Sequence, residues 1–173
     1  MKIFITRHGE TDSNVAKRIM GQRVDDVLNE EGKRQAKELS ERIQDMEFDH
    51  IFSSPLQRAS QTAHAVAKGR TITVVPRDEL KEVDYGSISG QTQEEAAVLT
   101  LGTQAHRTAY LAQQYDFRTF GGESVEVVQE RFLKLIDELR ENYSDRRVLL
   151  VTHSGIIRLA HHLFRDVPAT NID

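Results

Sequence analysis

The residues with the clearest chemical potential are Arg7 and His8, which stand next to each other directly after the apolar run 3–6. Imidazole is a nucleophile at neutral pH, and a neighbouring guanidinium neutralises phosphoryl oxygens. We therefore predict that His8 attacks phosphorus. Gly9 lets a backbone carbonyl approach the ring closely enough to select its tautomer.

A second arginine, Arg58, is predicted to complete a phosphate clamp with Arg7. Guanidinium forks match two phosphoryl oxygens and stay charged at working pH. An arginine on a helix is often only a solvated surface residue. The place of Arg58 in the first turn after Ser53-Ser54-Pro55, where serine can cap and proline suits a helix start, favours the clamp.

His153 follows the apolar run 148–151 and precedes a helix start. A histidine there can donate to a phosphoryl oxygen, and the helix N-terminus adds unpaired N–H groups. The rival interpretation makes Ser154 a nucleophile with His153 as its base. We disfavour it because the side chains of residues adjacent in sequence rarely face one another, as a nucleophile and its base must. In addition, no Gly-x-Ser-x-Gly motif is present.

A phosphate monoester also needs a proton donor, because its departing alkoxide is a poor leaving group. A carboxylic acid close to the phosphate suits this task. Four carboxylates follow the strand predicted at 71–75 closely enough to qualify, and spacing does not select one of them: Asp78, Glu79, Glu82 and Asp84.

Composition narrows the class of protein. The chain has 173 residues, a formal net charge of -4 and no cysteine, which excludes disulfides, thiolate catalysis and the usual zinc frameworks. No metal-ligand or nucleotide-binding motif is present, so we expect no metal and no cofactor. The charge argues against nucleic-acid and membrane partners. No membrane span and no signal peptide are evident, so we expect a cytoplasmic protein.

Hydrophobic patterning predicts how these residues are positioned. Strands are expected at 2–6, 48–53, 71–75 and 147–152, and helices at 11–17, 30–45, 55–68, 92–116, 123–142 and 154–164. Apolar strands alternating with helices predict an α/β fold of three layers, with a mostly parallel central sheet and helices on both faces. Ligands bind beyond the carboxyl ends of such strands, where the three motifs lie.

We expect one domain over residues 1–173, with 82–121 as an excursion that faces the substrate. Taken together, the motifs resemble those of the histidine phosphatase superfamily, which has the phosphoglycerate-mutase-like fold. The resemblance rests on residues 7–11, 53–63, 80–86, 121–124 and 151–155, and it covers most of the chain.

The resemblance implies a metal-independent phosphatase that works through a phosphohistidine on His8. It implies that Arg7, Arg58 and His153 hold the phosphoryl oxygens. It also selects Glu82 as the acid that protonates the departing oxygen and then activates water. The residues expected to contact the substrate besides these are Asn14, Gly21 and Ser154.

Two departures from the family pattern have consequences. The chain stops at Asp173, before the further strand-forming sequence usual in the family, so the first strand is expected at an exposed edge that invites a homodimer. Residues 87–90 replace an aromatic and an acidic residue that often form the pocket wall.

A mutase acting on phosphoglycerate and a non-catalytic phosphate-binding module remain alternatives. Mutases of this family carry a longer insertion with paired arginines, whereas the excursion here holds only the separated Arg107 and Arg118. The presence of the whole catalytic set disfavours the module. A phosphatase acting on a small phosphorylated metabolite is therefore the favoured interpretation.

Overall fold

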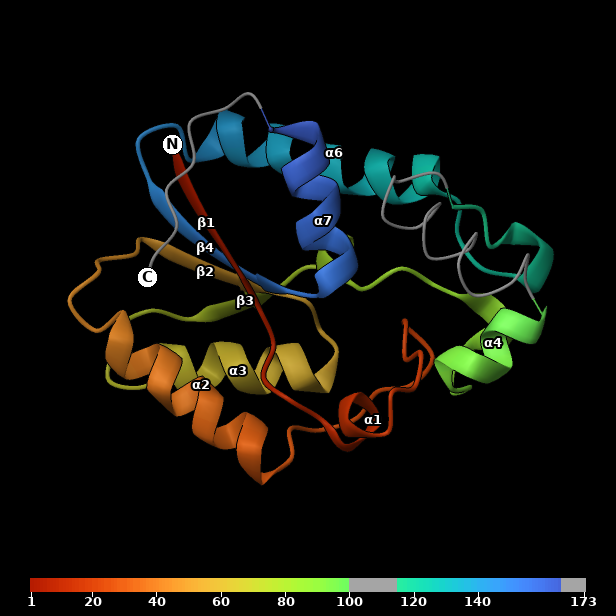
Figure 1. Cartoon of the computed structure of the whole chain (residues 1–173). Helices are drawn as coiled ribbons and strands as arrows, with labels where there is room; N and C mark the ends of the chain where they lie inside the picture. The colour runs from red at the N-terminus through yellow and green to blue at the C-terminus, as the bar shows by residue number, and fades with distance from the viewer. Residues whose placement is uncertain (100–114, 166–173) are drawn as a thin grey trace.

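The computed structural model describes residues 1–99 and 115–165. Its centre is a sheet of four parallel strands in the order β1-β4-β2-β3 (Figure 1). The strands are β1 (Lys2–Arg7), β2 (His50–Ser53), β3 (Val74–Pro76) and β4 (Arg147–Thr152). Because all four run the same way, their carboxyl ends meet along one edge of the sheet.

Helices cover both faces of the sheet, as Figure 1 shows. The helices α2 (Glu30–Arg42) and α3 (Gln57–Ala67) pack on one face, and α6 (Val125–Asn142) and α7 (Ser154–Leu163) pack on the other. The predicted three-layer α/β architecture is confirmed. Short elements make the connections: α1 (Asp12–Val15), η1 (Asp78–Leu80), η2 (Gly86–Ile88), α4 (Gln93–Leu99) and η3 (Arg118–Phe120).

The alternation of side chains along β4 explains why the sheet needs a cover on both faces. Val148 and Leu150 belong to the apolar cluster under α6 and α7. Leu149 and Val151 belong to the cluster under α2 and α3. Successive strand residues point to opposite faces, so an unbroken apolar strand must be buried on both sides.

β1 is an edge strand of the described sheet and pairs with β4 alone there, from Lys2 opposite Arg147 to Arg7 opposite Thr152. The expected edge position is therefore found. A groove of about 800 Å³ runs along it, lined by residues that include Ile3, Ile157 and Phe164. Pairing with a second copy stays a prediction.

Several predicted boundaries were wrong. The third strand begins at Val74 rather than at 71, because the ladder on β2 offers only Ile51–Ser53 as partners. The helix predicted over 92–116 is seen as α4, and residues 100–114 lie outside the described chain. Asp116 forms a β-bridge with Ser124 instead of continuing a helix.

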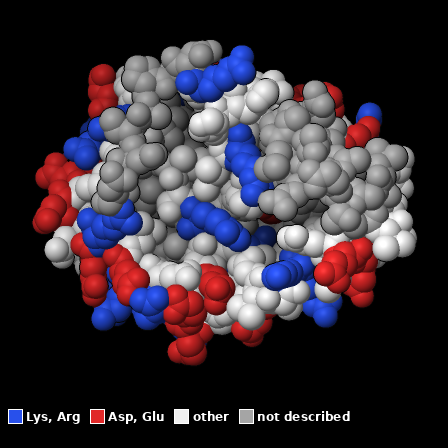
Figure 2. Space-filling view, viewed as in Figure 1, with Lys and Arg blue, Asp and Glu red and all other residues white. Residues whose placement is uncertain are grey.

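Charged side chains of both signs are spread over the molecule. On the face in Figure 2, acidic and basic groups both appear around the margin, and neither sign covers it. Within residues 1–99 and 115–165, no helix combines the length and the apolar character needed to cross a membrane.

Candidate active site

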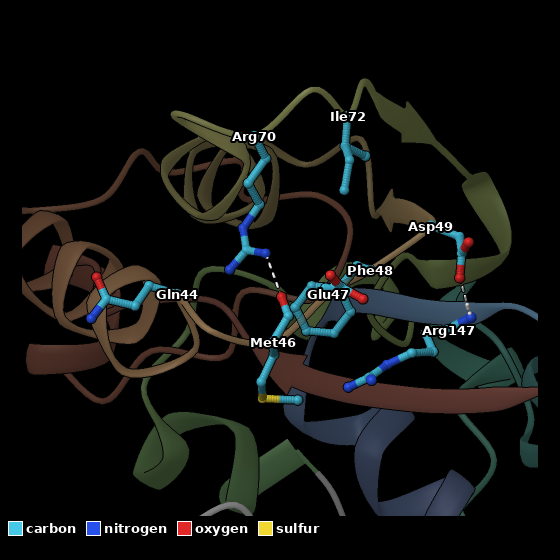
Figure 3. A pocket seen from close by; sticks show the side chains of 8 residues that line it. All are labelled: Gln44, Met46, Glu47, Phe48, Asp49, Arg70, Ile72 and Arg147. Carbon is cyan, nitrogen blue, oxygen red and sulfur yellow. Dashed lines mark hydrogen bonds between the residues drawn. The ribbon is translucent and has the colours of Figure 1, made fainter.

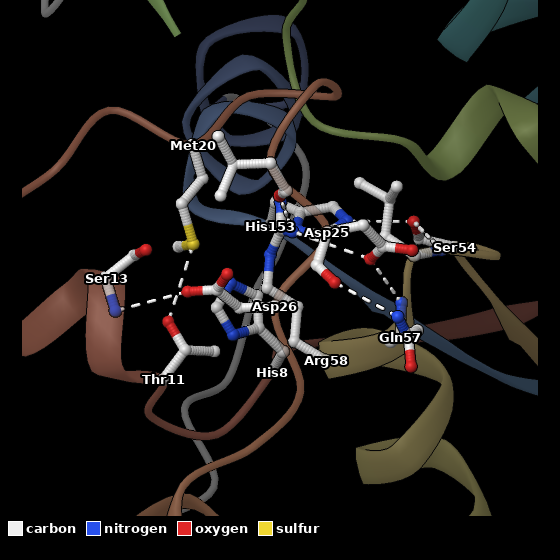
Figure 4. A network of polar contacts seen from close by, with 12 residues as sticks. His8, Thr11, Ser13, Met20, Asp25, Asp26, Ser54, Gln57, Arg58 and His153 are labelled. Atoms are coloured by element: carbon white, nitrogen blue, oxygen red, sulfur yellow. Dashed lines mark hydrogen bonds and ion pairs between the residues drawn. The ribbon is translucent and has the colours of Figure 1, made fainter. Parts of the chain in front are cut away.

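The carboxyl ends of three strands bring the predicted residues together. His8 follows β1, His153 follows β4, and Arg58 lies in the first turn of the helix that follows β2. The rings of His8 and His153 are 5.1 Å apart between centroids (Figure 4). His8 and Glu82 are 7% exposed, whereas Arg58 and His153 are fully buried. Four polar side chains buried close together are typical of a functional site.

The His8 ring is held in one tautomer by the backbone. Its Nδ1 lies 2.6 Å from the Gly9 carbonyl oxygen, which can only accept, so Nδ1 carries the proton and Nε2 keeps its lone pair. Burial, together with the charges of Arg58 and Arg7, lowers the pKa of His8 to about 3. The imidazole is therefore neutral and nucleophilic at physiological pH.

Gly9 is required by packing as well as by this hydrogen bond. A Cβ on Gly9 would lie 2.5 Å from the carbonyl oxygen of Gly32, at the start of α2. The Gly9 N–H donates to Thr62 Oγ1 on α3 at 3.0 Å. The turn that presents His8 is thus clamped between α2 and α3, and any side chain at position 9 would displace it.

Arg58 binds the loop after α1 and still has hydrogen-bond donors that are not used. Its guanidinium donates to the carbonyl oxygens of Val24 at 2.9 Å and Gly21 at 2.8 Å. Its Nε is buried with no partner in the described part of the chain. Burial lowers the pKa of Arg58, and the nearby Glu82 carboxylate opposes that shift. A phosphoryl oxygen would satisfy the remaining donors.

Local contacts separate Glu82 from the three carboxylates that competed with it. Asp78, Glu79 and Asp84 each form an ion pair, with Lys81 at 3.0 Å, Arg77 at 3.2 Å and Arg23 at 2.8 Å, respectively. Glu82 instead accepts from the N–H groups of Val83 and Gly155, at 2.9 and 3.2 Å. It therefore lies against the N-terminus of α7, beside His153.

Arg131 on α6 supports the segment that carries Glu82. Its guanidinium donates to the carbonyl oxygens of Glu79 at 2.7 Å and Glu82 at 3.1 Å, and forms a 3.0 Å ion pair with Glu123. The Glu123 carboxylate accepts from the Asp84 N–H at 2.9 Å. Sequence reasoning missed Arg131, because nothing local marks an arginine that bonds carbonyls some 50 residues away.

Two of the three further residues predicted to contact substrate, Gly21 and Ser154, hydrogen-bond to members of this cluster. Asn14 Oδ1 accepts from the Thr11 N–H in a capping box, which leaves its amide NH₂ group to point elsewhere. Gly21 contributes its carbonyl to Arg58, and Ser154 Oγ donates to Glu82 at 3.4 Å. Arg7, the last residue of β1, is exposed and acts on both histidines through its charge.

The excursion is described in part. Arg107 lies outside the described residues. The Arg118 guanidinium pairs with Asp116 at 2.6 Å on the surface. Tyr85 packs edge-on against Phe117, with ring centroids 4.9 Å apart, and covers Gly21, where φ is +59°. Tyr85 thus joins the excursion to the loop that Arg58 holds.

A model of the histidine phosphatase superfamily (branch 1) matches residues 3–173. The chain belongs to this superfamily. Phosphoserine phosphatase 1 of Hydrogenobacter thermophilus is 31% identical over 91% of this chain and 73% of its own length. The probable phosphoglycerate mutase GpmB of Proteus mirabilis is 34% identical over 88% of this chain and 69% of its own.

A solved structure agrees with this assignment. The mycobacterial glucosyl-3-phosphoglycerate phosphatase in complex with VO₃ superimposes with a TM-score of 0.82 at 31% identity, covering 97% of this chain and 83% of that one. This histidine phosphatase therefore has the phosphoglycerate-mutase-like fold, and its relatives are phosphatases and mutase-like proteins.

Proposed function

We propose that this histidine phosphatase is a metal-independent phosphomonoesterase that works through a phosphohistidine on His8 and acts on a small phosphorylated metabolite. The observation that carries the proposal is the 2.6 Å contact between His8 Nδ1 and the Gly9 carbonyl. It keeps the lone pair on Nε2 in a buried ring whose neighbours are Arg58 and His153.

The reaction has two steps. In the first, His8 Nε2 forms a bond to phosphorus while the ester P–O bond breaks, and Glu82 gives its proton to the departing oxygen. Arg7 and Arg58 neutralise the charge of the phosphoryl oxygens throughout, and His153 donates a hydrogen bond to one of them. In the second, Glu82 takes a proton from water, whose oxygen attacks phosphorus and releases His8. In the second step Glu82 thus recovers the proton that it gave in the first.

Hydrolysis of p-nitrophenyl phosphate in the presence of a metal chelator tests the metal-independent part. We expect turnover that the chelator leaves unchanged and that His8→Asn abolishes. Turnover that depends on added metal, or that persists in His8→Asn, would contradict the proposal. Asparagine is chosen because its carboxamide fills space similar to the His8 imidazole but is not a nucleophile.

Mutase activity is the second candidate, because a probable phosphoglycerate mutase is among the similar proteins. Gripping a substrate carboxylate needs free cations near the phosphate, and the guanidinium of Arg118 is already paired with Asp116. We therefore expect 3-phosphoglycerate to be hydrolysed rather than isomerised. A panel of phosphorylated metabolites that includes phosphoserine and 3-phosphoglycerate separates the two activities by their products.

A further inference from the structure

Ser54 follows β2 and is fully buried beneath the candidate site. Its Oγ lies 2.8 Å from Nε2 of His153 (Figure 4). The same Oγ accepts the N–H of Leu56 at 3.3 Å. A serine oxygen that already accepts one hydrogen bond still has its own proton to donate.

The other nitrogen of the His153 ring, Nδ1, points away from Ser54. It is buried and has no hydrogen-bond partner in the described part of the chain. Burial lowers the pKa of His153 well below its usual value, and the charges of Arg58, Arg131 and Arg7 add to that shift. The ring is therefore neutral, with one N–H to place.

We propose that Ser54 is a positioning residue: its hydroxyl donates to Nε2 of His153 and so keeps the ring proton on Nδ1, ready for a phosphoryl oxygen. This inference rests on the proposed function, because it assumes that a phosphoryl group binds between the two histidines. In the opposite tautomer, Nε2–H would donate to Ser54 and Nδ1 would present a lone pair to the anion, which is repulsive.

The hydrogen-bond partner of His8 differs in kind from that of His153. The partner of His8 is a carbonyl, which can only accept, so the proton is drawn away from the attacking nitrogen. The partner of His153 is a hydroxyl, which can donate or accept, and when it donates to Nε2 the ring proton lies on Nδ1, the nitrogen that faces away from Ser54. Two adjacent neutral imidazoles thus serve as nucleophile and as hydrogen-bond donor.

Nuclear magnetic resonance of the imidazole nitrogens tests the tautomer directly in the whole protein. Long-range ¹H–¹⁵N correlation should show the His153 proton on Nδ1, both in the free protein and with orthovanadate. In Ser54→Ala we expect a substantial population with the proton on Nε2. A parent protein whose His153 already carries the proton on Nε2 would overturn the inference.

Ser53→Ala is the matched control, because Ser53 Oγ is equally buried but donates to the Ser54 carbonyl, at 2.8 Å, rather than to a histidine. We expect this variant to keep the parent tautomer and nearly the parent kcat. A tautomer change of the same size in Ser53→Ala would assign the effect to general loosening and contradict a role specific to Ser54.

Kinetics add a graded readout. Removal of one positioned donor typically lowers kcat by about 10²–10³-fold, so we expect a loss of about 10²-fold in Ser54→Ala. Ser54→Cys keeps a weak donor and should lie between the parent and Ser54→Ala, with orthovanadate affinity following the same order. Equal loss in both variants would indicate a packing role and overturn the inference.

Failure of this inference can be told apart from failure of the proposed function. A parent protein that shows the Nδ1–H tautomer but forms no phosphohistidine refutes the reaction while leaving the Ser54 contact in place. A parent protein that forms the phosphohistidine but shows Nε2–H at His153 refutes the role of Ser54 alone.

Discussion

The two ends of the parallel sheet use arginine in different ways. At the amino end, Arg70 donates to the carbonyl oxygens of Ile43, Met46 and Val66 and stacks over the Phe48 ring at 5.2 Å. Figure 3 shows this region, where a cavity of about 410 Å³ is lined by the α2–β2 and α3–β3 connections and by the first residue of β4.

At the carboxyl end, Arg58 donates to only two carbonyl oxygens and keeps a buried Nε without a partner in the described part of the chain. Arg70 has every nitrogen engaged, so it is a structural brace. Arg58 braces a loop and still has unused donors beside His8. An unpaired buried donor does not by itself distinguish the two ends, because Nε of Arg147 at the amino end also lacks a hydrogen-bond partner among the described residues. What distinguishes the carboxyl end is that the unpaired Nε of Arg58 lies near the buried rings of His8 and His153, where an anion can bind.

Among the substitutions that compare the two ends of the sheet, Arg58→Lys should have the largest effect on activity. A lysine ammonium cannot donate to both loop carbonyls and to a phosphoryl oxygen at once, because it lacks the planar fork. We expect kcat for p-nitrophenyl phosphate to fall by about 10³-fold. Circular dichroism checks that the variant is folded, and a folded variant with parental kcat would remove Arg58 from the site.

Glu82→Gln tests whether Glu82, at the same end of the sheet, acts as the base of the second step. p-Nitrophenolate leaves without much help, so the first step should stay fast, whereas the attacking water loses its base. We expect a steady-state rate about 10²-fold lower, preceded by a burst of p-nitrophenolate as phosphoenzyme accumulates. Stopped-flow absorbance measures both, and an equal loss in both phases would contradict the role in the second step.

Acid should destabilise the carboxyl end of the sheet specifically. The pKa of His8 is about 3 in the folded protein and 6.5 in the unfolded chain. As the pH falls, the His8 ring is therefore protonated in the unfolded chain before it is protonated in the folded protein. The stability that His8 contributes is full above pH 6.5 and is lost as the pH falls towards 3, at about 1.4 kcal/mol per pH unit.

Urea unfolding between pH 4 and 7 measures this contribution. We expect the free energy of unfolding of His8→Asn to fall less steeply with acid than that of the parent, by about 1.4 kcal/mol per pH unit. Parallel curves for the two proteins would show that His8 is not protonated more readily on unfolding.

Arg70→Lys should have the smallest effect on catalysis, because Arg70 lies at the opposite end of the sheet. Losing carbonyl contacts and the Phe48 stacking should lower the free energy of unfolding by about 1–3 kcal/mol. The kcat of the folded variant should stay within about twofold of the parent. A loss of activity comparable to that of Arg58→Lys would erase the contrast between the two ends.

Sequence reasoning was most successful where chemistry and topology coincide. An apolar run followed by a reactive residue predicts a buried strand with that residue at its carboxyl end, and His8 and His153 lie there. The choice of Glu82 needed the resemblance to the family, because spacing alone does not select it from the three competing carboxylates. The structure supplies the physical reason, since those competitors are engaged in ion pairs.

The missed features depend on contacts that are distant in sequence. The segment 53–55 predicts that a serine caps the following helix, yet α3 begins at Gln57 with no side-chain cap, and the Ser54 hydroxyl contacts His153. Arg131 reads as an ordinary charged helix residue until the chain folds and brings it to the Glu82 carbonyl. Neither partner can be assigned from local periodicity.

The central claim is that His8 carries the phosphoryl group in transit. Quenching a reaction with labelled substrate in alkali preserves phosphohistidine, and mass spectrometry of the resulting peptides locates it. The account predicts one phosphoryl group on His8, more of it in Glu82→Gln than in the parent, and none in His8→Asn. Turnover with no phosphorylated His8 in either protein, or with the label on another residue, would contradict it.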